Sequence, residues 1–340
     1  MKRSLIFSGV ALFSLLVSGC NLVPTPKKKS SSVTPNPSGI TTDSTGGSSF
    51  GPTTSDDSSS EDISSSSDVP PGPSSSSSST SITPTPSPID PDTYYSGISD
   101  SLTGTALKTA LYKLIKITSK ILDYDDLFDV YRKSDVRPDG EHFWDIYSDK
   151  TDYTLYDSRI NNGYSDEGDS LNREHMIPQS IFNEAYPMKA DPHHVLPSDG
   201  YVNNRRSNFP HDNLTSTTWT SQDGFKVGYY NDVQSFEPKA KYKGDIARIM
   251  FYFITCYEGK ISSFKNYAPF DKSTNDLTTH YVEVYLKWHL DDPVDSKETI
   301  RNDAITEFQP NRNPFIDRPQ YACKIWGERN STTKTLCGIN

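Results

Sequence analysis

The chain has 340 residues and a formal net charge of -10, and only 33% of its residues are hydrophobic although Tyr (20) and Phe (15) are plentiful. This length allows one large domain or two small ones, and the aromatic residues provide a core of ordinary size. The acidic balance excludes a broad basic surface that packages nucleic acid, but it leaves room for an enzyme that holds nucleic acid through a few local cations.

Residues 1–20 have the pattern of an export signal. Lys2 and Arg3 precede an apolar run over residues 5–17, which is too short to favour a spanning helix of roughly 20 apolar residues. Small residues lead into Cys20, and this arrangement resembles the bacterial lipobox. The resemblance implies a lipid on Cys20 that anchors the protein to the outer face of the cell membrane, with plain secretion as the alternative.

Residues 21–92 consist of Ser, Thr and Pro with scattered acids, including an unbroken serine run over residues 74–79. Such a segment cannot bury enough apolar surface to offset its loss of conformational entropy on ordering. We therefore expect a disordered tether that holds a folded domain of residues 93–340 away from the membrane.

Apolar spacing predicts the elements of the folded part. Residues 105–120 place Leu107, Leu111 and Leu114 on one helical face, with Thr103 or Thr105 as the cap. Further elements are predicted as helices at 125–131, 244–257 and 281–290 and as a buried strand at 143–147. The expected class is α+β, mostly helical around a small two-stranded piece.

Three cysteines remain if Cys20 is acylated. Cys323 and Cys337 are close in sequence, and an exported protein permits a disulfide between them. Cys256 is an equally possible partner or a buried free thiol, so the sequence leaves the pairing open. We expect no catalytic thiol.

The segment 171–208 has the densest set of reactive side chains. It contains Glu174, His175, Asp191, His193, His194, Asn203, Arg205 and Arg206. Hydrolysis of a phosphodiester needs a base for water, a hard cation and stabilisation of the extra phosphate charge, and this inventory supplies such groups. Zinc is disfavoured, because no cysteine lies near the paired histidines.

The motifs of this segment resemble the bacterial endonuclease I family. Glu-His, two apolar residues and Pro stand at 174–178, Asp-x-His-x-x-x-Pro at 191–197, and Gly-x-Val-Asn at 200–203. Blocks similar to the family also occur at 102–104, 135–140, 243–248 and 311–317. The resemblance covers roughly residues 94–327, and several blocks in order are more specific than any one of them.

The resemblance implies a ββα-metal, or His-Me finger, core. Residues 174–177 would form its first strand and residues 193–196 the second, and a helix starting near Pro197, with Ser198 as its cap, would carry Asn203. Adjacent residues of a regular strand face opposite sides, so a site shared by Glu174 and His175 requires a twist, bulge or strand end.

The resemblance also implies the roles of five residues. His175 matches the general base, and Glu174 and Asn203 match ligands of one divalent cation, Mg²⁺ with Ca²⁺ or Mn²⁺ as alternatives. Some members carry a phosphate-binding Arg in a long insertion, but the connection 179–190 is short here and has none. Arg206 and then Arg248 are the expected phosphate contacts, although Arg248 could instead pair with an acid.

The sequence thus predicts an extracellular metal-dependent nuclease, anchored or secreted, that cleaves DNA and/or RNA with little sequence specificity. The resemblance implies products with 5′-phosphate and 3′-hydroxyl ends. No protein partner is implied. Its alternative is a surface-anchored binding lipoprotein that retains an inactive nuclease scaffold, because a fold does not prove an activity.

Overall fold

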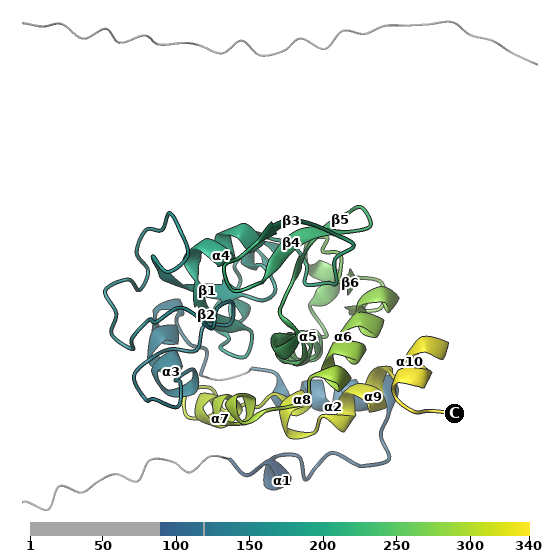
Figure 1. The fold of residues 1–340 in the computed structure, drawn as a ribbon. Coiled ribbons are helices and arrows are strands. Elements are labelled where there is room, and N and C mark those ends of the chain that lie inside the picture. The colour runs from purple at the N-terminus through teal and green to yellow at the C-terminus, as the bar shows by residue number, and fades with distance from the viewer. Residues whose placement is uncertain (1–88, 118–119) are drawn as a thin grey trace, which may run out of the picture. The chain divides into compact units, whose positions relative to one another are not determined.

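A computed structural model of the protein describes residues 89–117 and 120–340 (Figure 1). The expected export signal, the acylated Cys20 and the tether as far as residue 88 lie outside these described residues. The last residues assigned to the tether contact the domain, since the Arg312 guanidinium donates a hydrogen bond to the Ile89 carbonyl at 3.0 Å. The short helix α1 (Pro91–Tyr94) begins directly after this contact.

The helix α5 (Lys243–Cys256) forms the centre of the domain, and every residue from Gly244 to Cys256 is buried. A helix that is covered all round must be surrounded by other elements. The elements α2 (Gly104–Ile115), α6 (Thr279–Asp291) and α8 (Pro314–Asp317) pack against it. Two further helices, α9 (Gln320–Trp326) and α10 (Ser331–Leu336), pack against α6.

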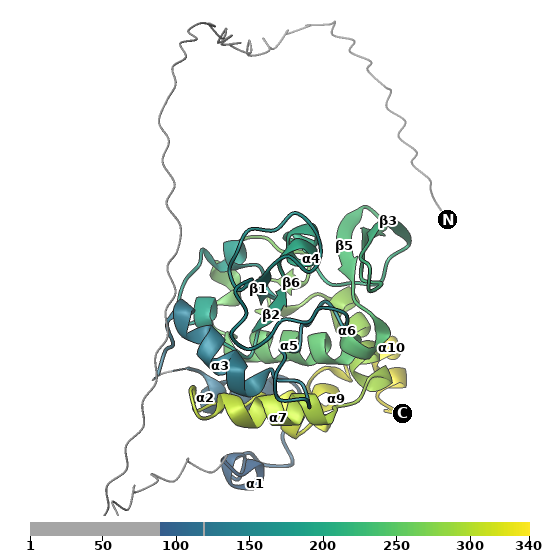
Figure 2. The ribbon, with the colours of Figure 1, turned by 60° about the vertical axis from the view of Figure 1, so that its left-hand side comes forward.

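A second group of helices lies beside the strand pair formed by Leu171–His175 and Val195–Asp199. A 3₁₀ turn (Tyr124–Asp126) leads into α3 (Leu127–Ser134), which packs against α7 (Ser296–Ile305). In Figures 1 and 2, α7 to α9 lie on the side of the domain away from the three-stranded sheet.

Within residues 89–117 and 120–340, the strands form three small antiparallel sheets. The first pairs β1 (Leu171–His175) with β2 (Val195–Asp199), and α4 (Gly200–Arg206) follows β2 directly. The second sheet contains β3 (Ser216–Thr220), β4 (Lys226–Tyr230) and β5 (Val233–Glu237). The third pairs β6 (Phe270–Asp271) with β7 (Asp276–Leu277). The predicted α+β class is confirmed, but the three-stranded sheet was not predicted.

The helices that apolar spacing predicted are present with shifted ends, whereas the strand predicted at 143–147 is wrong. That segment is buried but makes only isolated bridges, such as Val136 with Phe143. The Asp145 carboxylate accepts a hydrogen bond from the Tyr147 backbone N–H at 2.8 Å, which closes a turn two residues on. A side chain that bonds its own backbone in this way competes with a strand ladder.

The structure shows which of the three downstream cysteines are paired. Cys323 and Cys337 form a disulfide, and Cys256 is a buried free thiol. The disulfide joins α9 to Cys337, the residue directly after α10, and both lie far along the chain from β1 and β2.

No helix of the described residues has the length and apolar character needed to cross a membrane.

Replacing both Cys323 and Cys337 with Ser should lower the free energy of unfolding by about 3 kcal/mol, because the bridge closes a loop with a sequence separation of 14. Denaturant unfolding of the wild type and the double variant measures this difference. If the denaturant concentration at the unfolding midpoint does not change, the disulfide does not stabilise the protein by restricting the unfolded chain.

Candidate functional site

The connection between β1 and β2 is held by a buried carboxylate. Asp191 accepts hydrogen bonds from the hydroxyls of Tyr252 at 2.9 Å and Tyr257 at 2.7 Å, both on the α5 side of the core. Its other oxygen accepts from the Gln309 amide at 2.8 Å and the His193 backbone N–H at 3.1 Å. Four donors satisfy the buried charge. Asp191 therefore fixes the return of the chain to β2.

The corner between β2 and α4 depends on Asp199 and Gly200. Asp199 caps α4, accepting from the Val202 backbone N–H at 2.8 Å, whereas Ser198, the predicted cap, lies within β2. A Cβ atom on Gly200 would lie 2.8 Å from the Tyr164 ring, closer than real Cβ atoms approach other atoms. The strand therefore passes into the helix without a loop.

The imidazole of His175 lies in an aromatic pocket with one ring nitrogen fixed. It is stacked with Tyr124 at a centroid distance of 5.9 Å and borders Phe182 and His194. Its Nε2 lies 3.0 Å from the Lys189 carbonyl oxygen. A carbonyl only accepts, so Nε2 carries the proton and Nδ1 has the free lone pair.

That lone pair is available at neutral pH. Burial of the ring, with a smaller contribution from His194, lowers the pKa of His175 to about 3, so the imidazole is neutral. Nδ1 accepts no hydrogen bond from any residue in the described ranges. A neutral imidazole held through Nε2 by a carbonyl, with Nδ1 open, has the arrangement of a general base.

Glu174 points to a different set of groups from its neighbour. Its Oε1 accepts from the Tyr147 hydroxyl at 2.7 Å and from Nη1 of Arg206 at 2.7 Å. Burial raises the pKa of Glu174 to about 7, and the Arg206 charge opposes this shift. Among the described residues, no group donates to Oε2, so one carboxylate oxygen is left for another partner.

Asn203 brings a second oxygen donor to β1. It lies partly exposed on α4, and its Nδ2 donates to the Arg173 carbonyl at 3.3 Å, next to Glu174 in the strand. Within the described part of the chain, Oδ1 has no hydrogen-bond partner, and no hydrogen bond joins the carboxamide to Glu174 or His175.

Glu174 Oε2 and Asn203 Oδ1 are oxygens of the kind that hard cations prefer, and two protein ligands suit Mg²⁺, which keeps several waters. Across residues 89–117 and 120–340, no three His, Cys, Asp or Glu side chains gather around a possible metal position. The pair above contains one carboxylate and one amide. The donor chemistry of this pair fits a divalent cation.

Arg206 was expected to contact phosphate, and its geometry argues against that role. The residue is 1% exposed, and its guanidinium donates to Glu174, to the His175 carbonyl at 2.8 Å and to the Met176 carbonyl at 2.6 Å. Its Nε donates to the Phe209 carbonyl at 3.1 Å. Arg206 therefore connects α4 to β1. The i,i+3 spacing between Asn203 and Arg206 showed that they share a helix face, but it could not show that the Arg206 side chain is buried.

Arg248 also needs correction as a phosphate contact. It is 0% exposed, and its Nε and Nη2 donate to the Glu298 carboxylate of α7 at 2.5 and 2.6 Å. Its Nη1 donates to the Asp292 carbonyl at 2.8 Å, and Asp245 lies at 3.4 Å. The acid-pairing alternative describes this residue, because α5 faces α7 here.

Two cations that the sequence motifs did not single out, Lys189 and Arg173, border the pocket of His175. The ammonium of Lys189 lies 2.8 Å from Glu184 and 5.5 Å from the Tyr124 ring centroid, and its side chain is 23% exposed. Arg173 lies over the rings of Tyr124 and Phe128, at 4.2 and 4.6 Å from their centroids. Lys189 lies in the connection 179–190, which contains no arginine.

His193 and His194 have structural partners. Nε2 of His193 donates to the Asn311 carbonyl at 3.1 Å, and Nε2 of His194 donates to the Met188 carbonyl at 2.6 Å. Burial lowers their pKa values to about 4 and about 3, respectively. Both rings are therefore neutral groups that hold the connection between β1 and β2.

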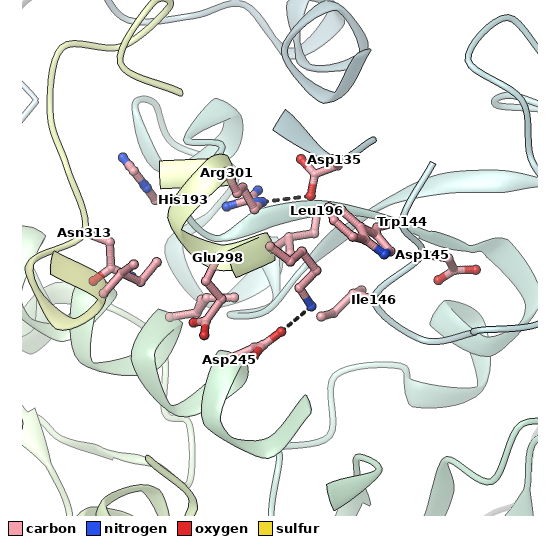
Figure 3. Close-up of a pocket in the computed structure, with 13 residues that line it drawn as sticks. Asp135, Trp144, Asp145, Ile146, His193, Leu196, Asp245, Glu298, Arg301 and Asn313 are labelled. Carbon is pink, nitrogen blue, oxygen red and sulfur yellow. Dashed lines mark hydrogen bonds and ion pairs between the residues drawn. The ribbon is translucent and has the colours of Figure 1, made fainter. Parts of the chain in front are cut away.

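A small cavity lies between β2, α5 and α7 (Figure 3). Two ion pairs line it, Lys297 with Asp245 and Arg301 with Asp135. Its volume of about 30 Å³ suits a water molecule or two rather than a nucleotide. Glu174, His175 and Asn203 do not line it, so it is separate from the candidate site.

Substitution of Arg206 by Ala should lower the free energy of unfolding by about 3–5 kcal/mol, because it leaves the Glu174 carboxylate buried without its partner. Arg205→Ala is the matched control, since Arg205 is exposed on the same helix and should change stability by less than about 0.5 kcal/mol. Denaturant unfolding distinguishes them. A stable Arg206→Ala protein with impaired substrate binding alone would restore the phosphate-contact role.

The chain matches a described family over the segment that contains these residues. The family model Endonuclease I matches residues 103–320, which include β1, β2 and α4. An extracellular ribonuclease of Bacillus amyloliquefaciens is 36% identical over 250 residues, 71% of this chain and 80% of the relative. An extracellular ribonuclease of Bacillus subtilis (strain 168) is 34% identical over 242 residues, 70% of this chain and 79% of the relative. An extracellular deoxyribonuclease of Aeromonas hydrophila is 26% identical over 136 residues, 40% of this chain and 53% of the relative.

Proposed function

The chain belongs to the endonuclease I family, and we propose that this endonuclease is an exported, divalent-metal-dependent enzyme that cleaves RNA with little sequence specificity. Two relatives named extracellular ribonucleases cover 70% and 71% of the chain, whereas the deoxyribonuclease relative covers 40%. These names support RNA as the preferred substrate and DNA as a secondary one. They also support an extracellular location.

The observation that carries the proposal is the hydrogen bond between His175 Nε2 and the Lys189 carbonyl. It fixes the tautomer and directs Nδ1 away from that partner, so the ring is oriented before any substrate arrives. His175 then accepts the proton of the attacking water at Nδ1. Pre-orientation reduces the entropy that must be lost to align base and nucleophile.

Glu174 and Asn203 are proposed as the protein ligands of the cation, through Oε2 and Oδ1. Mg²⁺ is the expected ion, with Mn²⁺ or Ca²⁺ as alternatives, and when bound it supplies positive charge that stabilises the phosphate in the transition state. Arg206 holds Glu174 by its other oxygen, Oε1, so the carboxylate is oriented by a buried charge. The free carboxylate and amide oxygens support this assignment.

Lys189 is proposed as the cation that faces the phosphate, in place of Arg206 and Arg248. Its backbone carbonyl contacts His175, and among the described residues its ammonium forms an ion pair with Glu184 alone, whose side chain is 56% exposed. An exposed ion pair contributes little to stability, so a phosphate can displace the carboxylate at small cost. Arg173 is less accessible, with a side chain that is 8% exposed.

The N-terminal pattern completes the proposal. We propose that the signal directs export and that acylated Cys20 anchors the enzyme, with release into the medium as the alternative. Glu174, His175 and Asn203 are all present, so nothing favours an inactive scaffold that serves only as a binding protein.

Replacing His175 with Ala should reduce RNA cleavage by about 10²- to 10⁴-fold, because the proton acceptor is lost. The initial rate of cleavage with Mg²⁺ present measures the effect, with EDTA added to the wild type as a second way of stopping the reaction. His142→Ala serves as the control, because His142 pairs with Asp139 and is not among the rings that surround His175. Cleavage by His175→Ala at the wild-type rate would reject its role as the base.

Lys189→Met should reduce cleavage by about 10²-fold through loss of charge beside the phosphate, whereas Lys189→Arg should retain most of the activity. Both variants keep the backbone carbonyl that holds His175. Lys287→Met is the matched control, since Lys287 is also a partly exposed lysine paired with a partly exposed acid. If Lys189→Met cleaves RNA within about twofold of the control, the phosphate cation lies elsewhere.

A further inference from the structure

A buried chain of hydrogen bonds continues behind Glu174. The Tyr147 hydroxyl lies 2.7 Å from Glu174 Oε1 and 2.8 Å from His211 Nε2. Tyr147 and His211 are 0% exposed, and Glu174 is 2% exposed. The geometry therefore links the candidate metal ligand to a histidine that the sequence analysis assigned to no site.

The direction of each bond follows from the single hydroxyl proton of Tyr147. Glu174 Oε1 accepts from the Tyr147 hydroxyl and from Nη1 of Arg206. The single hydroxyl proton of Tyr147 therefore goes to Glu174, and the hydroxyl oxygen accepts from Nε2–H of His211. This fixes the His211 tautomer, and its Nδ1 is buried without a partner in the described parts of the chain.

The three-stranded sheet holds both rings in place. The Tyr147 ring lies 4.8 Å from Phe236 of β5 and 5.6 Å from Phe225, measured between centroids. The His211 backbone pairs with Phe236 in an isolated parallel bridge, and its carbonyl accepts from the Tyr285 hydroxyl at 3.0 Å. The unpredicted sheet and α6 thus form a rigid support behind the carboxylate.

We propose that Tyr147 and His211 are positioning residues that hold Glu174 so that Oε2 remains available to the cation. This inference rests on the proposed role of Glu174 as a metal ligand. With Tyr147 and Arg206 both on Oε1, the carboxylate plane is fixed by two donors. Without the hydroxyl, the carboxylate is free to turn toward the Arg206 guanidinium, whose planar fork favours bonds to both oxygens of a carboxylate. Such a turn withdraws Oε2 from the cation.

Groups that orient a metal ligand typically change metal affinity by about 10- to 100-fold when they are removed. Tyr147→Phe keeps the buried ring and removes only the hydroxyl. His211→Leu removes the donor to Tyr147, whereas His211→Gln retains an amide N–H donor. Tyr95→Phe is the control, because it removes another buried hydroxyl that bonds a carboxylate, that of Asp317 at 2.9 Å, on a different part of the domain.

The experiment measures Mn²⁺ binding to the full chain by calorimetry and RNA cleavage as a function of Mg²⁺ concentration. Tyr147→Phe should weaken Mn²⁺ binding by about 10- to 100-fold and raise the Mg²⁺ concentration for half-maximal cleavage by a similar factor. Saturating Mg²⁺ should restore most of the rate. His211→Leu should show the same shift in smaller degree, and His211→Gln should recover it.

Thermal unfolding separates positioning from loss of structure. Tyr147→Phe and Tyr95→Phe should lose similar stability, and only Tyr147→Phe should change the metal dependence. Unchanged Mn²⁺ binding in Tyr147→Phe would overturn the inference. If Tyr147→Phe does not fold, the comparison of His211→Leu with His211→Gln decides it by the same measurement.

The variant Glu174→Gln distinguishes an error in this inference from an error in the proposed function. If Glu174→Gln binds Mn²⁺ as the wild type does, Glu174 is not a ligand, and the proposed metal site fails together with the inference. If Glu174→Gln loses Mn²⁺ binding while Tyr147→Phe keeps it, the metal site stands and only the positioning role is wrong.

Discussion

The buried ion pair between Arg206 and Glu174 is the interaction on which the site depends. It joins α4 to β1, and the same guanidinium holds the carbonyls of His175 and Met176. One side chain thus fixes the end of the strand that carries the candidate base and the helix that carries Asn203. A buried ion pair costs desolvation energy that its attraction and hydrogen bonds must offset, so it is weak evidence for stability but fits a role in fixing geometry.

The two adjacent functional residues of β1 point in different directions. Glu174 and His175 contact different groups, as alternation along a strand requires. The carboxylate meets Tyr147 and Arg206, whereas the imidazole meets Tyr124 and the Lys189 carbonyl. β1 ends at His175, where Arg206 bonds to the side chain of Glu174 and to the backbone carbonyl of His175.

Apolar spacing is a local signal and predicted the α+β class, whereas the resemblance to the endonuclease I family implied the order of two strands and a helix around Asn203. It placed the helix cap at Ser198, one residue before the observed cap Asp199, and the helix start near Pro197, three residues before Gly200. It could not show that Arg206 and Arg248 are buried, because burial depends on elements distant in the chain. Arg248 meets Glu298, 50 residues on, and Tyr147 reaches Glu174, 27 residues on. Lys189 was missed because its relation to His175 runs through a backbone carbonyl, which leaves no residue-type signal.

The most direct test of the account is anomalous scattering from crystals soaked in Mn²⁺. A single strong peak should lie within about 2.0–2.3 Å of both Glu174 Oε2 and Asn203 Oδ1, with Glu174 Oε1 still bonded to Tyr147 and Arg206. A manganese peak bound by other side chains, with the carboxylate of Glu174 and the carboxamide of Asn203 unliganded, would contradict the proposed metal site and the mechanism built on it.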